Sequence, residues 1–133
     1  MKLVTFEVQT VLGRFQRIGL IQPERSLILD LNATAAWMFN DEGRPQAQSW
    51  ADFLFPCEMR QFLAMGEPAM EAARQVESRM AGFSCDEALA LRGFGDAHLA
   101  FSTDAVKLKT PVPNPPMLRD FITFETHIGN ACK

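Results

Sequence analysis

Apolar and polar residues alternate over parts of the first thirty positions, and this pattern predicts β-strands. Two runs of this kind cover residues 3–8 and 14–21, and Gly13 provides a turn between them. A second turn at residues 22–25 leads to a third short run, residues 26–30. We therefore expect a three-stranded antiparallel meander with one covered face.

From about residue 31 the apolar residues recur at the spacing of helices. The first helix is expected over residues 32–39, with Asn32 or Asp30 as its cap. A second, short helix is expected over residues 49–54, with Ser49 as its cap. Both helices are followed by Gly or Pro residues that end them.

Two further helices are predicted over residues 58–65 and 67–80. Pro68 suits the first turn of the longer helix, and Gly82 lies just beyond its end. One stripe of this helix is apolar and is expected to face the core: Ala69, Ala72, Ala73, Val76 and Met80.

The segment after residue 86 has weaker helical character and leads to a loop at Gly93-Phe94-Gly95. This pair of glycines does not form a phosphate-binding loop, because no strand precedes it and no third glycine or Lys-Ser/Thr pair follows. A last short strand is expected over residues 105–108. His98, which follows the loop, is expected at the surface.

Four prolines lie among residues 110–116 and predict an extended, semi-rigid connector. The predicted organisation is an N-terminal domain over 1–109, a connector over 110–117 and a separate segment over 118–133. The fold class is α+β: a small antiparallel β-meander packed with several short helices, then the connector and a terminal helix.

Composition narrows the classes of protein that fit. The chain has 133 residues, of which 47% are hydrophobic and 22% charged, with a net charge of −3. This balance indicates a globular protein. Lys and Arg do not cluster, so a nucleic-acid partner is not expected. No apolar run approaches the roughly 18 residues of a membrane span, so no membrane partner is expected either.

The cysteines indicate a reducing compartment. Cys57, Cys85 and Cys132 are odd in number and far apart, and they lack CxxC spacing. This argues against both a disulfide framework and a zinc site. Because residues 1–10 also lack the apolar core of a signal peptide, we expect a cytoplasmic protein.

The candidate chemistry lies beyond the connector, at Asp120 and His127. They are seven positions apart, so on a helix they would lie within about 20° of each other and about 10 Å apart along the axis. A carboxylate in this arrangement could hold a hard cation, and the imidazole could move a proton. The same spacing also fits a helix cap and a residue that stabilises a helix C-terminus.

One run extends from the connector through both candidate residues: Pro111-Val112-Pro113-Asn114-Pro115-Pro116-Met117-Leu118-Arg119-Asp120-Phe121-Ile122-Thr123-Phe124-Glu125-Thr126-His127. This run resembles a junction in the fumarylacetoacetate hydrolase family. In bacterial members this junction joins the N-terminal domain to the catalytic domain. The opening residues 1–6, with 19–21 and 28–31, are similar to the β-meander at the start of the same proteins.

The resemblance implies a metal-dependent hydrolase of carbon–carbon bonds in β-diketone, acylpyruvate and related oxo-acids. It implies Mg²⁺ or Ca²⁺ as the cofactor, Asp120 as the first metal ligand and His127 as the residue that activates water. Ile122 differs from the substrate-contacting Tyr of many members, so the substrate is left open. The other metal carboxylates of the family lie downstream of this region, so we expect the 133-residue chain alone to be inactive. A homodimer is compatible with this assignment.

Two other interpretations stay open at this point. The chain could be a non-catalytic binding or scaffold module derived from the same domain. It could also be an unrelated enzyme with a Cys132–His127 thiol dyad. However, five positions of helix turn by about 500°, which places these two residues about 140° apart.

Overall fold

The N-terminal meander forms in the predicted order. In the computed structural model, which describes residues 1–117, β1 (Leu3–Thr10) and β2 (Gly13–Gln22) form a long antiparallel hairpin. β3 (Leu27–Asp30) then pairs with β2. Gly13 has a φ of 121° at the hairpin turn, a conformation that favours glycine.

Within the described residues the sheet has two more strands than the predicted meander. β4 (Ala100–Ser102) pairs with β3, and β5 (Lys107–Leu108) pairs with β1, so the order is β4-β3-β2-β1-β5. The strand expected over residues 105–108 is therefore shorter than predicted and starts two residues later. β4 has only three residues, too few to show an alternating pattern.

The sheet is strongly curled. The rings of Phe6 on β1 and Phe101 on β4 are in contact, with centroids 5.7 Å apart. In the sheet, however, β2 and β3 lie between β1 and β4. In a flat sheet, strands three places apart are about 14 Å from each other. Gly19 lies inside this curve, where an added Cβ would come within 2.9 Å of Phe6 and 2.5 Å of the Leu29 carbonyl oxygen.

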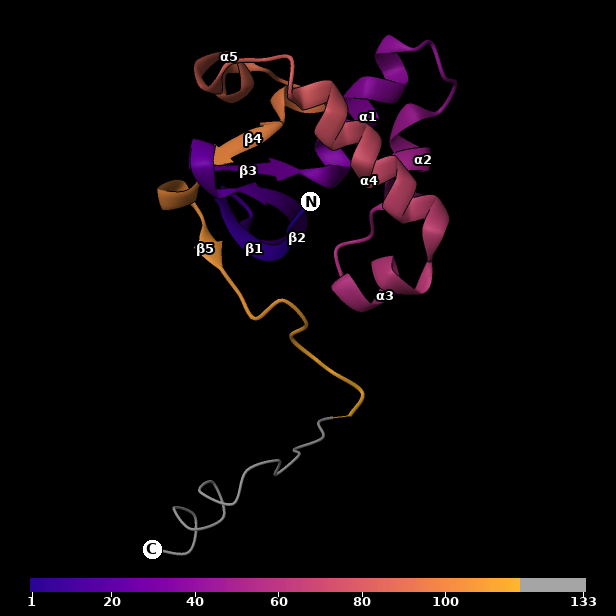
Figure 1. Ribbon diagram of the computed structural model, residues 1–133, viewed down its shortest axis with the longest axis vertical. Coiled ribbons are helices and arrows are strands. Elements are labelled where there is room, and N and C mark those ends of the chain that lie inside the picture. Colours follow the sequence, from indigo (N-terminus) through magenta and orange to yellow (C-terminus); the bar gives the residue numbers. More distant parts are fainter. Residues whose placement is uncertain (118–133) are drawn as a thin grey trace, which may run out of the picture.

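Most of the helices lie together on one side of the sheet (Figure 1). The five α-helices of the described part are α1 (Leu31–Asp41), α2 (Ala47–Leu54), α3 (Met59–Ala64), α4 (Glu67–Met80) and α5 (Cys85–Ala90). Single 3₁₀ turns occur at η1 (Pro23–Arg25), η2 (Phe94–Asp96) and η3 (Thr103–Ala105). The α+β class expected from the sequence is thus confirmed.

Of the two cap predictions, one is confirmed and one is wrong, and α5 has a cap that was not predicted from the sequence. Asp30 caps α1, because its carboxylate accepts a hydrogen bond from the Ala33 N–H. Ser84 caps α5 through a capping box with Glu87. The prediction that Ser49 caps α2 is wrong, since that helix starts at Ala47 without a side-chain cap. Ala47 is buried in the core, so packing sets this start.

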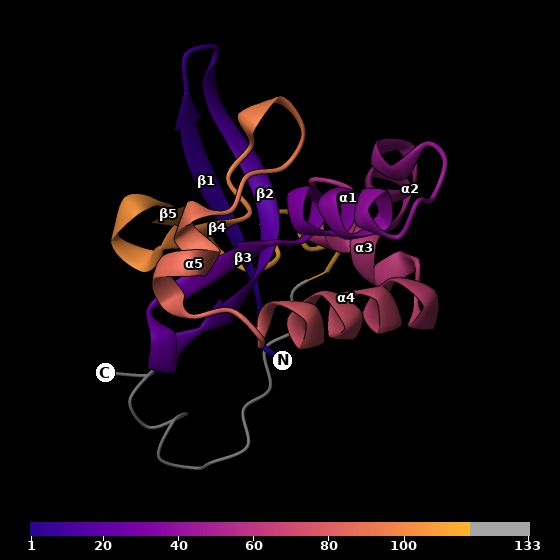
Figure 2. The ribbon, with the colours of Figure 1, turned by 90° about the horizontal axis from the view of Figure 1, so that it is seen from above.

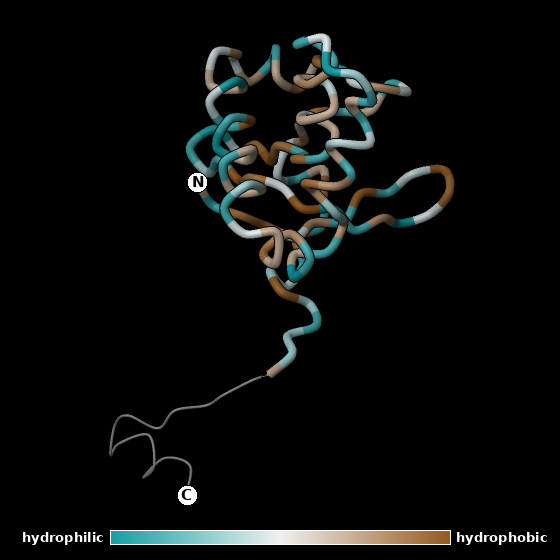
Figure 3. The backbone as a smooth tube through the Cα atoms, turned by 90° about the vertical axis from the view of Figure 1, so that its right-hand side faces the viewer, coloured by the Kyte–Doolittle hydropathy of each residue, from teal (hydrophilic) through white to brown (hydrophobic). Residues whose placement is uncertain are grey.

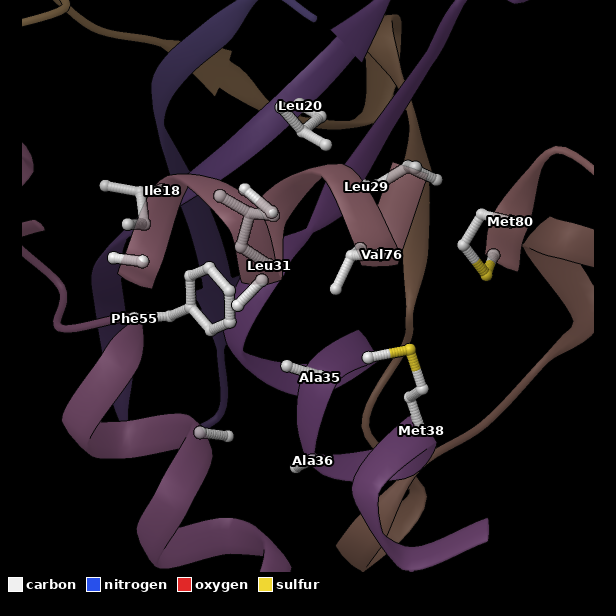
Figure 4. Packing of buried hydrophobic residues seen from close by; sticks show 14 of the residues in the cluster. Ile18, Leu20, Leu29, Leu31, Ala35, Ala36, Met38, Phe55, Val76 and Met80 are labelled. Carbon is white, nitrogen blue, oxygen red and sulfur yellow. The ribbon is translucent and has the colours of Figure 1, made fainter. Parts of the chain in front are cut away.

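The main core lies between the convex face of the sheet and the helices (Figure 4). Ile18, Leu20 and Leu29 reach it from the sheet, and each is almost fully buried. The predicted apolar stripe of α4 is buried throughout its length. A smaller apolar group fills the concave side, where Phe6 and Ile28 are inaccessible to solvent.

Candidate functional site

The two residues predicted to carry the chemistry, Asp120 and His127, lie outside the described residues, as does Cys132. The structure therefore does not test their predicted roles. It does describe the connector that leads to them, and the surfaces of the body from which the connector departs.

The start of the connector is tied to β1 by a buried threonine. The Thr5 hydroxyl donates a hydrogen bond of 2.7 Å to the Pro111 carbonyl oxygen, and the Lys109 N–H donates one of 2.9 Å to the Thr5 carbonyl oxygen. Thr5 has no exposed surface. Because an unpaired buried hydroxyl is costly, its bond to Pro111 holds the chain against the sheet.

Two further contacts hold the middle of the connector. Val112 packs against the main core, and Arg60 of α3 donates a hydrogen bond of 3.2 Å to the Asn114 carbonyl oxygen. A small cleft of about 60 Å³ lies beside this bond, lined by Gln16, Glu58, Met59, Arg60, Pro113 and Asn114. The connector is thus attached to the domain at several points between Lys109 and Asn114, whereas sequence pattern alone predicted only its stiffness.

A buried ion pair joins the sheet to α1. The Arg17 guanidinium donates two hydrogen bonds to the Asp30 carboxylate, of 2.8 and 2.9 Å. The side chain of Asp30 is 4% exposed and that of Arg17 is 26% exposed. Burial is the largest single influence and lowers the pKa of Arg17, but the charge and hydrogen bonds of Asp30, together with smaller contributions from Cys57 and Asp52, outweigh it, so that this pKa is raised from its ordinary value.

Asn32 extends this pair into a polar network with α2. Its amide nitrogen donates to the Asp52 carboxylate at 2.9 Å and to the Phe55 carbonyl oxygen at 3.2 Å. The Gln48 amide bridges Asn32 and Asp52, at 3.1 and 2.8 Å. Each member bonds to another within the fold, and Asp30 is held by Arg17 and the helix cap. The network therefore fixes α1 and α2 to the sheet.

The concave side of the sheet opens at one end into a hollow of about 240 Å³, here called the sheet mouth. It is lined by Val8, Gln9, Thr10, Arg17, Asp30, Ala33, Ala97, His98 and Phe101. The ring centroids of His98 and Phe101 are 5.5 Å apart. His98 is exposed, which confirms the expectation from sequence. The sequence pattern did not predict the hollow, because it depends on the curl of the sheet.

Two apolar surfaces are exposed. The β1–β2 hairpin stands away from the rest of the molecule (Figures 2 and 3), and its tip exposes Val11, Leu12 and Phe15. On α2, Trp50 and Phe53 are 46% and 59% exposed and meet edge to face. Exposed apolar surfaces of this kind commonly mark contacts with other molecules.

Metal-binding groups are absent from the part of the chain that the structure describes. Residues 1–117 contain no group of three or more His, Cys, Asp or Glu side chains that could hold a metal ion. The predicted ligand Asp120 lies outside the described residues. Cys57 and Cys85 are both free thiols. Over the same residues no helix is long and apolar enough to cross a membrane.

The chain was also compared with known proteins. No family model, no curated protein and no solved structure matches it.

Proposed function

We propose that this chain is the N-terminal portion of a fumarylacetoacetate hydrolase-like protein, and that its folded body supports and positions the start of the catalytic part. The observation that carries this proposal is the attachment of the connector to the body. Thr5, Arg60 and the core contact of Val112 hold the segment that immediately precedes Asp120 and His127 in the sequence.

The attachments matter because a catalytic group must be held in a narrow range of positions. Misplacement by about 1 Å can lower a rate by orders of magnitude. A free linker of this length would let the following residues sample a wide volume. Bonds to Pro111 and Asn114 instead give the connector one path along the domain.

In this proposal Asp120 supplies one oxygen ligand and His127 accepts a proton from water. The bound Mg²⁺ or Ca²⁺ would polarise the oxygens of an oxo-acid substrate. A single carboxylate holds such an ion weakly, and residues 1–117 contain no group of three or more His, Cys, Asp or Glu side chains placed to hold it. The 133-residue chain alone is therefore inactive in this account. The free thiols of Cys57 and Cys85 suit the cytoplasm.

The test begins with the intact mass of the protein made from its native locus. A mass more than twice the 14.9 kDa of this chain supports the proposal, and the whole protein should then cleave an acylpyruvate in the presence of Mg²⁺. His127→Ala should abolish this activity while the protein stays folded. A large product that does not cleave acylpyruvates with Mg²⁺ or Ca²⁺, or whose cleavage survives His127→Ala, would overturn the proposal.

The second candidate is a non-catalytic binding module, and the exposed hairpin tip and the aromatic pair on α2 favour it. It predicts a native product near 14.9 kDa. Its thermal stability should not respond to Mg²⁺ or Ca²⁺, whereas a bound ion would raise it by mass action.

A further inference from the structure

Because the sheet is curled, the fold contains a preformed hollow, although the sheet does not close into a barrel. The Phe6–Phe101 contact closes the inner part of the concave side. The sheet mouth remains open beyond it, between the end of β1, the start of α1 and the loop before β4. Mouths of closed or curled sheets are common sites for small molecules.

Two side chains that line the mouth have a hydrogen-bond donor without a partner among residues 1–117. Arg17 binds Asp30 through Nε and Nη2 and approaches Asn32 with Nη2 at 3.5 Å. Its Nη1 has no hydrogen-bond partner among residues 1–117. The imidazole of His98 likewise makes no hydrogen bond within that range, and it lies beside the Phe101 ring. A neutral imidazole still carries one N–H donor, and a protonated one carries two.

The formal charges that line the mouth, those of Arg17 and Asp30, cancel, so an anion would be held there by hydrogen-bond donors rather than by net charge. Asp30 is its acidic lining residue, and that carboxylate already accepts bonds from Arg17 and from the Ala33 N–H. The first turn of α1 adds the partial positive charge of a helix start. Gln9 and Thr10 use their side chains within the hairpin, on Thr10, Arg14 and Gly13. They do not compete for the donors of Arg17 and His98.

The other walls of the mouth are apolar, and they set the shape of the ligand. Val8, Ala33, Ala97 and Phe101 line it, and the Phe101 ring, which also meets Phe6 and His98, is the phenyl group among them. The volume of about 240 Å³ is below the range of about 300–1,000 Å³ typical of drug-sized ligands. The fitting molecule is therefore small, on the order of ten non-hydrogen atoms.

We propose that the sheet mouth is a binding site for a small carboxylate with a flat apolar group, held by Arg17 and His98 and packed near Phe101. The carboxylate accepts hydrogen bonds from Arg17 Nη1 and the His98 imidazole, and the apolar group lies among Val8, Ala97 and Phe101. This proposal is separate from the proposed function, because binding here requires neither a metal nor the residues beyond the connector.

Benzoate is the probe, and benzamide is its uncharged control. Benzoate is titrated into the whole metal-free chain while backbone and imidazole NMR signals are recorded. We expect saturable shifts at residues 8–10 and 97–101, with a dissociation constant on the order of 1 mM. Benzamide should bind at least about tenfold more weakly, because it lacks the charge that strengthens both hydrogen bonds.

Two variants decide whether the mouth is the site. Ala97→Trp should fill the hollow and abolish the shifts, while Ala90→Trp, on the exposed end of α5, should leave them unchanged. His98→Ala should weaken binding about fivefold or more. Arg17 is left intact because its removal would unpair Asp30. Equal binding of benzamide, unchanged binding in Ala97→Trp or His98→Ala, or shifts confined to other parts of the chain would each overturn the proposal. Failure of acylpyruvate cleavage would not affect it.

Discussion

Replacement of Asp30 by alanine removes two interactions at once. Asp30 caps α1 through the Ala33 N–H, and it pairs with Arg17 through two short hydrogen bonds. Nothing else in the described part of the chain neutralises Arg17 at hydrogen-bond distance. The variant therefore leaves a helix without its cap and a largely buried guanidinium without its counter-ion.

The expected cost follows from these two losses. An N-cap of this kind is worth about 1 kcal/mol. Breaking a fully buried ion pair costs about 3–5 kcal/mol, but the Arg17 side chain is 26% exposed and can recover water, so we take about 2 kcal/mol. The sum is about 3 kcal/mol, which corresponds to a melting temperature lower by about 12 °C for a domain of this size.

Urea unfolding followed by circular dichroism measures this cost, and a double-mutant cycle separates the two parts. Asp30→Asn retains a capping oxygen and removes the charge, so it should cost about 2 kcal/mol. Combined with Arg17→Met, it should show a coupling energy of about 2 kcal/mol, because neither charge is then left unpaired. A coupling below about 0.5 kcal/mol, or a cost of Asp30→Ala below about 1 kcal/mol, would refute this reasoning.

Three other predictions follow from single contacts. Thr5→Val should loosen the connector and raise the rate of trypsin cleavage after Lys109 about fivefold, while Thr5→Ser, which keeps the hydroxyl, should not. Gly19→Ala should lower the free energy of unfolding by about 2–3 kcal/mol, measured in urea, because its Cβ would meet the backbone and two side chains; a neutral effect would contradict the observed curl. Hydrogen bonds from the Ser84 backbone lower the pKa of Glu87, so the capping box stabilises the fold above the ordinary Glu pKa, and this contribution is lost as the pH falls through the lowered value. An NMR titration should show the lowered pKa, and Glu87→Gln should reduce the loss of stability on the acid side.

Local sequence patterns were sufficient to predict those elements whose structure depends mainly on their own residues. Helix α4 begins and ends as predicted, because Pro68 suits its first turn and its apolar stripe faces the core. The hairpin and β3 follow from alternation and turn residues. Asp30 was one of two expected caps and is the one used.

Features that depend on distant residues were not predictable in this way. The edge strand β4, the curl and the sheet mouth arise when residues near position 100 return to pair with β3. The Thr5–Pro111 bond joins the two ends of the domain. A threonine among the apolar residues of a strand was the only signal for it. For the candidate site, Asp120 and His127 rest on spacing and resemblance, and their roles stay predictions.

The most direct test of the central claim compares two aspartates in the protein made from its native locus. The measurement is kcat/KM for acylpyruvate cleavage with Mg²⁺ in Asp120→Asn and in Asp104→Asn, whose side chain is exposed and lies in η3. The account predicts a loss of about a hundredfold or more in Asp120→Asn and none in Asp104→Asn. Equal activity of the two variants would contradict it.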